Sequence, residues 1–421
     1  MPLSPGSMLK KQIQRKLAIY FSALIFINCF VFWRSAHGIA IGLSDFASFY
    51  TAAEILHDGR GHQLYDLNLQ EKAQRSVMPE AVKERGGILP FNHPAFEAIV
   101  FLPLTVFSLH TAFWIWFSIN IGFLFAVIWV LRKYLPLVGQ APFYLWAGGC
   151  LAFPPIAITL IQGQDSIVLL FFYCMAFIAL RREAEFSAGG WIAAGLFKFQ
   201  VSLPFIVPLL LRRRWRIIAG FSFVGTLLVI ISVATVGFAG LLQYPNYVWK
   251  LDHDPTFGWL VPFRTPNIHG LILSAPLSSF PRLCDALLAI FSGILVAAGA
   301  FAWRTGSSSS YRSLYRAFAG NLLISVLLSY HILVHDLSVL FLALLLVAEN
   351  AAGGLHSEEW VKTLTWACVA LLWSPLYLIL MRIHRLDLLA IVFLILLGTV
   401  VIQSPRGKPL GEQASQNPAI S

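Results

Sequence analysis

Charged side chains are scarce in this sequence: Asp, Glu, Lys and Arg make up only 12% of its 421 residues, whereas a soluble domain contains about 25%. Alternation of apolar and polar residues over strand-length stretches is also missing, which excludes a membrane β-barrel. The five cysteines lie in apolar stretches and form no C-x-x-C pair, so we expect neither a disulfide framework nor a zinc site. A soluble enzyme with a single membrane anchor is therefore excluded.

Long apolar runs are what the sequence has instead. Hydrophobic residues make up 58% of the chain, and runs long enough to cross a bilayer, roughly 17–25 residues each, recur from Leu17 to Gln403. We therefore predict an all-α polytopic membrane protein with about ten transmembrane helices plus partial or re-entrant segments. It would consist of a basic cytoplasmic tail over 1–16, a transmembrane domain over 17–403 with external loops at 38–93 and 239–282, and a disordered cytoplasmic tail over 404–421.

Short clusters of Lys and Arg between the apolar runs contribute much of the formal net charge of +10. Such clusters mark the cytoplasmic ends of membrane helices, so they place both termini in the cytoplasm of a multi-pass protein of the plasma (inner) membrane. Nucleic-acid binding is not expected, although an anionic lipid would also suit a basic surface. The clusters are Lys10-Lys11, Arg15-Lys16, Arg132-Lys133, Arg181-Arg182, Arg212-Arg213-Arg214 and Arg216.

The first external loop contains two predicted helices. Apolar residues recur at helical spacing over 45–56, and 67–77 is amphipathic, so we expect two helices lying on the membrane surface. Beyond this loop, 95–108 is apolar but short and contains a proline, which indicates a partial span. The segment 188–211 is expected to enter the membrane and return as two half-helices, because a single span would separate two arginine clusters and Pro204 favours a break.

Most of the unusual polar residues fall on one face if the N-terminus is cytoplasmic. Asp45 follows the first apolar run, where a carboxylate is costly unless it is paired or functional. On the same external side we expect the turn Gln164-Asp165, the re-entrant tip at Lys198, the loop 239–282 and the turn from His331 to Asp336. This coincidence predicts a water-facing site built around Asp45.

Each of these residues also has a purely structural interpretation. Asp45 could cap the helix that follows it, and Gln164-Asp165 could cap the next one. Lys198 could extend its ammonium group to the membrane interface. The residues from His331 to Asp336 could form a hydrogen-bonded turn, and polar residues of the second long loop often have no special role.

The ordered set of short motifs around these residues resembles glycosyltransferase family 87, within the GT-C superfamily of polytopic transferases. The resemblance covers roughly residues 40–350, and it rests on the order of the motifs rather than on any one of them. The motifs are Asp45-Phe46-Ala47-Ser48-Phe49-Tyr50-Thr51-Ala52-Ala53, Gly61-His62-Gln63-Leu64-Tyr65-Asp66, Phe91-Asn92-His93-Pro94, Pro103-Leu104, Gly163-Gln164 and Ala194-Gly195-Leu196-Phe197-Lys198, the last followed by Pro204 and the arginine run.

The resemblance implies a GT-C-like fold and a polyprenyl-phosphate sugar donor, commonly the mannose form. We therefore expect a mannosyltransferase-like hexosyltransferase that moves the sugar to a lipid or glycan acceptor on the external or periplasmic side, with inversion. One carboxylate is sufficient for inversion. The sequence does not require a metal, and no cofactor is expected. The expected partners are the lipid donor, the acceptor and membrane lipid.

The predicted residue roles combine residue chemistry with the resemblance. Asp45 would accept the proton of the acceptor hydroxyl, assisted by His331. Cationic and amide side chains would hold the donor phosphate, namely Lys198, Gln164, Arg264 and His335. Residues for acceptor binding or support are Tyr50, Asp66, His93, Asp336 and His269.

A transporter or flippase of a lipid-linked sugar would also need polar residues within the membrane. Such proteins often show paired repeats with broken helices in matching positions, and no internal repeat is evident here. A non-catalytic scaffold would not need two long external loops with polar residues. The transferase is therefore the preferred interpretation.

Overall fold

The computed structural model describes residues 5–254, 261–304, 311–352 and 358–402, and every regular element in these ranges is a helix. The expected disordered tail over 404–421 lies outside the described residues. The chain divides into two compact units. The first unit comprises Met1–Arg132, Val138–Phe171 and Val224–Leu260, and the second comprises Lys133–Leu137, Phe172–Phe223 and Val261–Ser421.

Six helices are long and apolar enough to cross a membrane, or up to eight if each of two bent helix pairs counts as one span. The bent pairs are α8 (Phe143–Ala152) with α9 (Pro154–Gln162), at 65°, and α18 (Glu359–Leu372) with α19 (Leu376–Arg382), at 59°. Three further apolar helices are shorter. The helical multi-pass class is therefore confirmed, with six to eight candidate spans among the described residues where the sequence predicts about ten.

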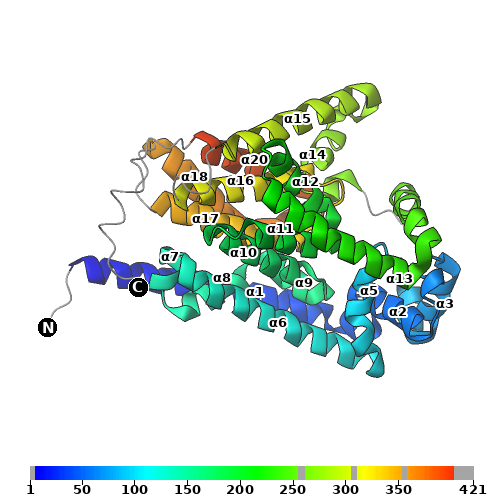
Figure 1. Ribbon diagram of the computed structural model, residues 1–421. Coiled ribbons are helices and arrows are strands. Elements are labelled where there is room, and N and C mark those ends of the chain that lie inside the picture. Colours follow the sequence, from blue (N-terminus) through cyan, green and yellow to red (C-terminus); the bar gives the residue numbers. More distant parts are fainter. Residues whose placement is uncertain (1–4, 255–260, 305–310, 353–357, 403–421) are drawn as a thin grey trace. The chain divides into compact units, whose positions relative to one another are not determined.

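The first unit begins with α1 (Pro5–Ile41), which is longer than the predicted span over 17–37. The described part of the basic tail is therefore a continuation of this helix. α1 packs along α8 and contacts α9 (Figure 1). The bend between α8 and α9 follows from the prolines that begin α9, because proline lacks an N–H and forces the preceding residue, Phe153, into an extended conformation.

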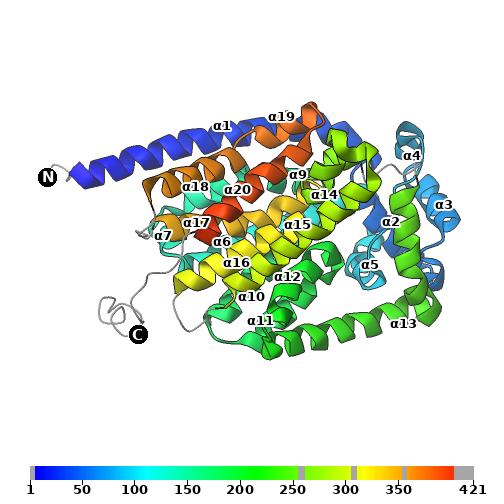
Figure 2. The same ribbon diagram turned by 90° about the horizontal axis from the view of Figure 1, so that it is seen from above.

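α2 (Phe46–His57) lies in the core of the first unit, which corrects the prediction of a helix on the membrane surface. Nine of its twelve residues are buried, because small or apolar side chains surround it on all sides, and such a helix is stable only when it is covered. α3 (Leu67–Val77) is amphipathic, as predicted, and a short helix that was not predicted, α4 (Pro79–Arg85), follows it. α5 (Ala95–Phe101) completes this cluster, in which α2 contacts both α3 and α5 (Figures 1 and 2).

α13 (Trp215–His253) consists of two helices joined at Gly237, where φ is +76° and ψ is 170°. Glycine adopts a positive φ without steric cost, so the helix can change direction there. From Val224 onward α13 belongs to the first unit, and its Tyr244 and Tyr247 rings pack against Tyr65. The predicted second external loop therefore begins as a helix.

A helical hairpin forms part of the second unit. α11 (Glu185–Ala194) and α12 (Phe199–Leu211) are joined by the 3-10 helix η3 (Gly195–Lys198). Glu185, at the start of α11, forms an ion pair of 3.0 Å with Arg214, just beyond α12. A straight helix of this length would hold these ends about 40 Å apart. The chain therefore turns back within this segment, as two half-helices would require. By length and composition the segment could also be one span, so its re-entrant course in the membrane stays a prediction.

Glycines allow this hairpin to pack closely on the first turns of α13. A Cβ atom at Gly189 would lie 1.9 Å from the carbonyl oxygen of Ile217, and one at Gly220 would lie 1.9 Å from that of Phe186. Small residues at helix crossings let two backbones approach in this way. The base of the hairpin is therefore fixed by backbone contact.

α16 (Tyr311–Leu328) is the most buried long helix of the second unit. It packs against α12, α15 (Pro281–Ala302), α17 (Leu340–Ala352) and α20 (Leu389–Ile402) (Figure 2). Polar side chains of α16 are bonded to the backbone of α12, because Asn321 Nδ2 and Ser325 Oγ donate to carbonyl oxygens at 2.8 and 3.1 Å. The remaining helices are η1 (Gly61–Gln63), η2 (Leu102–Val106), α6 (Leu109–Tyr134), α7 (Pro136–Gln140), α10 (Ser166–Arg181), η4 (Pro262–Arg264), α14 (Ile268–Leu273), η5 (Pro276–Ser279), η6 (His335–Val339) and η7 (Leu386–Leu388).

Candidate active site

Asp45 is the residue immediately before α2, and it is partly exposed. Its side chain makes no capping hydrogen bond to α2. Instead, Asp45 Oδ2 accepts a hydrogen bond from Gln164 Nε2 at 2.9 Å, and the Asp45 backbone N–H donates to Gln162 Oε1 at 3.3 Å. The capping interpretation is therefore wrong, and the carboxylate is oriented by a turn that is distant in sequence.

The turn that holds Asp45 is itself rigidly placed. Gly163 ends α9 with φ of +63°, and a Cβ atom there would lie 2.7 Å from Cβ of Phe46. The Trp116 indole donates to the Gly163 carbonyl at 3.0 Å, and the Gln164 N–H donates to the Thr159 carbonyl at 3.0 Å. Glycine is required at this position because the backbone is left-handed and the neighbouring helix is in contact.

Arg85, at the end of α4, adds a positive charge to this region. Its guanidinium donates to the carbonyl oxygens of Gly42 and Leu43 at 3.4 and 3.2 Å. Burial lowers the pKa of the Arg85 guanidinium, while the negative charge of Asp45 acts in the opposite direction. An arginine stays protonated under all ordinary conditions, so Arg85 keeps a positive charge in this region. Arg85 is not among the site residues predicted from the sequence.

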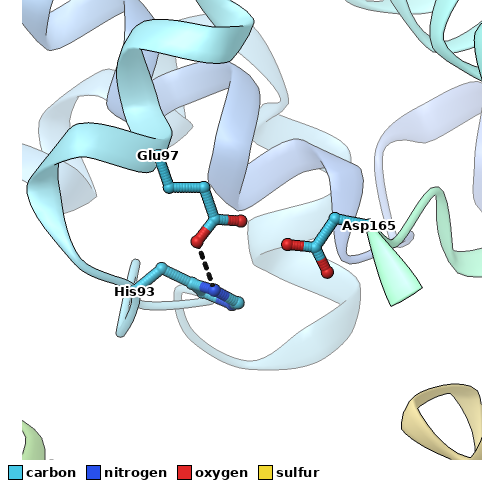
Figure 3. Close-up of side chains that lie close together, drawn as sticks. All are labelled: His93, Glu97 and Asp165. Atoms are coloured by element: carbon cyan, nitrogen blue, oxygen red, sulfur yellow. Dashed lines mark ion pairs between the residues drawn. The ribbon is translucent and has the colours of Figure 1, made fainter. Parts of the chain in front are cut away.

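A second polar cluster of the first unit consists of His93, Glu97 and Asp165 (Figure 3). His93 Nδ1 lies 2.8 Å from Glu97 Oε2, and one polar atom from each of the three residues lies within 4.8 Å of the other two. The His93 ring contacts the Phe49 ring at a centroid distance of 4.8 Å. Asp165 directly follows Gln164, so the turn that orients Asp45 also carries one member of this cluster. Glu97 is new, although its position four residues after His93 in an apolar stretch is a signal that could have been read.

Two other predicted residues of the first unit have clear structural contacts. The Tyr50 hydroxyl donates to the carbonyl of Phe107 at 2.7 Å. Asp66 caps α3, because its Oδ1 accepts hydrogen bonds from the N–H groups of Asn68 and Leu69 at 2.9 and 3.4 Å. Both residues stabilise the loops around α2, which is a supporting role.

The second unit contains a buried ion pair at the tip of the helical hairpin. Lys198 Nζ lies 3.2 Å from Asp336 Oδ1, and the two side chains are only 3% and 1% exposed. His335 Nε2 lies 3.5 Å from the same carboxylate oxygen, and Asp336 Oδ2 accepts a hydrogen bond from the Leu333 N–H at 3.0 Å. Lys198 therefore does not reach out to a membrane interface. Its ammonium group is held inside the protein by a carboxylate.

The turn between α16 and η6 connects this ion pair to the second predicted external loop, 239–282. Asn267 caps α14 through the N–H of Gly270 at 2.7 Å, and its amide donates to the carbonyl of Ser329. The Ser329 hydroxyl in turn donates to the carbonyl of His331 at 2.9 Å. In the second unit, α14 therefore lies against the turn that carries His331, His335 and Asp336.

His269 and Arg264 differ in their surroundings. His269 lies in α14, and its Nδ1 atom is buried without a hydrogen-bond partner among the described residues. Burial lowers the pKa of the His269 imidazole, so this ring favours its neutral form. Arg264 ends the 3-10 helix η4 and is exposed. The predicted site residues therefore form two groups, one in each unit.

A comparison with protein families identifies the chain. The model of glycosyltransferase family 87 matches residues 91–330, which is more than half of the 421 residues. The matched range contains His93, Gln164 and Lys198, whereas Asp45 precedes it and His331 follows it directly. No curated protein and no solved structure matches the chain. This all-helical, multi-pass chain belongs to glycosyltransferase family 87.

Proposed function

We propose that the protein transfers a hexose, mannose in the first instance, from a polyprenyl-phosphate donor to a hydroxyl group of a lipid or glycan acceptor on the external face of the membrane. The observation that carries the proposal is the state of Asp45. This carboxylate is partly exposed between α1 and α2, is oriented by Gln164, and is not used as a helix cap. The family assignment favours a transferase over a transporter of lipid-linked sugars.

Asp45 acts as the general base in this proposal. It accepts the proton of the acceptor hydroxyl while the hydroxyl oxygen forms a bond to the anomeric carbon. The bond between that carbon and the phosphate oxygen breaks, and polyprenyl phosphate leaves with the bonding electron pair. Attack from the face opposite the phosphate inverts the anomeric configuration, and general-base assistance of this kind contributes about 10²–10⁴-fold to the rate.

The donor phosphate is assigned to the cationic group of the second unit. An ammonium group has three N–H donors, so Lys198 can bind an anion while Asp336 continues to hold it. Preorganised positive charge at the point where the leaving group becomes anionic stabilises the transition state. His335 and the exposed Arg264 would assist phosphate binding, and the neutral His269 ring would accept a hydrogen bond from the acceptor.

The test is sugar transfer in liposomes that contain the full-length protein and labelled polyprenyl-phosphate mannose. Asp45→Asn removes the base but keeps the shape and the Gln164 contact, and we expect its turnover to fall at least 100-fold, the lower end of a general-base contribution of about 10²–10⁴. Asp58→Asn is the matched control, because Asp58 is an exposed carboxylate of the same unit that pairs with Arg60.

Three outcomes distinguish the parts of the proposal. Loss of transfer in Asp45→Asn, with Asp58→Asn active and both variants folded, supports the base. Equal transfer by Asp45→Asn and the unmodified protein would retain the enzyme and remove Asp45 from its role. Movement of the intact donor across the bilayer without transfer would replace the transferase by a flippase. The anomeric configuration of the product, read by NMR, tests inversion.

A further inference from the structure

We propose that His93, Glu97 and Asp165 form a binding site for one divalent metal cation, of the class that prefers mixed nitrogen and oxygen ligands, such as Mn²⁺ or Zn²⁺. No metal was expected from the sequence. The three side chains come from two separate segments and point toward one another (Figure 3). One ligand atom from each lies within 4.8 Å of the others.

The geometry is close to that of a metal site. Ligand atoms at about 2.1 Å from a metal lie about 3.0 Å apart when adjacent and about 4.2 Å apart when opposite. The pair His93 Nδ1 and Glu97 Oε2, at 2.8 Å, already has the spacing of adjacent ligands. All three ligand atoms lie within 4.8 Å of one another, which is close to the separation of opposite ligands.

The charges of the cluster also suit a dication. Glu97 and Asp165 are both almost fully buried, at 3% exposure each, and two ionised carboxylates at this separation disfavour each other's charge. A divalent cation would neutralise both and would be bound by the neutral imidazole as well. Carboxylates with one imidazole are ligands for Mn²⁺ and Zn²⁺ rather than for soft metals, which prefer thiolates.

The local structure holds the ligands in advance. His93 and Glu97 are four residues apart across the start of α5, which puts the two side chains on the same side. Asp165 is fixed by the turn at Gly163 and by its own carbonyl, which accepts hydrogen bonds from the N–H groups of Val168 and Leu169 at 2.9 and 3.1 Å. Three protein ligands leave at least one coordination position open, which a water, a sugar hydroxyl or a phosphate oxygen could fill.

A cation here would also act on Asp45. Asp165 is covalently next to Gln164, whose amide donates to the Asp45 carboxylate, so a metal bound by Asp165 would fix the turn that orients the proposed base.

The triplet Asp252-His253-Asp254 at the end of α13 is a weaker candidate for a metal site. Its His253 ring stacks on Trp249 of the same helix, and in the described part of the chain the cluster around Glu97 is the one group of three such ligands.

The rival interpretation is that a protonated His93 links the two carboxylates and no metal binds. The test uses purified full-length protein in detergent, stripped with a chelator and titrated with MnCl₂ or ZnCl₂. Binding is read by Mn²⁺ electron paramagnetic resonance, by elemental analysis after desalting, and by the unfolding temperature. We expect one metal per chain, a higher unfolding temperature on loading, and an affinity at least about 10–100-fold lower in Glu97→Gln and in Asp165→Asn.

Glu71→Gln is the matched control for these variants, because Glu71 is an exposed carboxylate on α3 that pairs with Arg75. It should bind metal as the unmodified protein does. Failure of the unmodified protein to bind either metal with saturation would overturn the site. Unchanged affinity in both cluster variants would do the same. None of these measurements depends on sugar transfer, so the metal site and the proposed function can fail separately.

Discussion

Breaking the buried ion pair between Lys198 and Asp336 should destabilise the second unit far more than breaking an exposed pair of similar length. The Lys198–Asp336 pair spans 3.2 Å with side chains 3% and 1% exposed, whereas Lys362 and Glu359 are 2.9 Å apart and 28% and 87% exposed. Distance alone predicts equal effects. Burial predicts a large difference, because removal of one partner leaves a buried charge without its counter-ion.

The expected magnitude follows from this exposure. Removal of one partner of a buried pair costs about 3–5 kcal/mol, whereas an exposed pair contributes about 0–1 kcal/mol. For a unit of roughly 200 residues, each kcal/mol changes the unfolding temperature by about 2–4 °C. We therefore expect Lys198→Met to lower the unfolding temperature by about 6–20 °C. Lys362→Met, the matched control, should change it by less than about 4 °C.

The assay is thermal unfolding followed by tryptophan fluorescence, with all variants in one detergent at one heating rate. The double variant Lys198→Met/Asp336→Leu leaves no buried charge from this pair, so it should recover most of the stability that Lys198→Met loses. A similar small effect of Lys198→Met and Lys362→Met would refute the reasoning. So would a double variant whose loss equals the sum of the two single losses, because the charges would then not be coupled.

Two further predictions concern Gly163 in the first unit and His269 in α14. Gly163→Ala places a Cβ atom 2.7 Å from Cβ of Phe46 at a φ of +63°, so it should lower the free energy of unfolding by about 1–3 kcal/mol. It should also reduce sugar transfer, because it disturbs the turn that holds Asp45. An unchanged unfolding temperature together with unchanged transfer would contradict this prediction. Burial lowers the pKa of the His269 imidazole below its ordinary 6.5, so the folded state binds fewer protons than the unfolded state and loses stability as the pH falls below 6.5. His269→Gln should therefore show a smaller fall in unfolding temperature between pH 7.5 and 5 than the unmodified protein, and equal slopes would exclude the effect.

The structure separates predictions that depend on local pattern from those that depend on folding. The hairpin over 185–211 was predictable, because two arginine clusters and a proline constrain a short segment. The burial of α2 was not, because a helix with small and aromatic residues on all sides is stable only when other elements cover it, and local sequence does not show that α3, α5 and η2 pack around it. Capping by Asp45 was a reasonable local expectation, and it was wrong because Gln164, 119 residues later, binds the carboxylate instead.

The partners of the polar residues could likewise not be predicted from local sequence patterns. Lys198 was recognised as unusual in an apolar stretch, but nothing near it in sequence indicates that Asp336 is its partner. Glu97 was overlooked, although its spacing of four residues from His93 was a local signal, whereas nothing in the local sequence indicates Asp165 as the third member of the cluster. The left-handed turn at Gly163 helps to place Asp165 beside His93 and Glu97.

The sequence alone determined that this is a helical multi-pass membrane protein and that its short motifs resemble family 87, because hydrophobic length, charge clusters and motif order are properties of the chain itself. The tertiary structure decided what each polar residue does. A buried charge must find its partner wherever folding brings one, so the roles of Asp45, Lys198 and the cluster around Glu97 depend on contacts that the linear order does not contain.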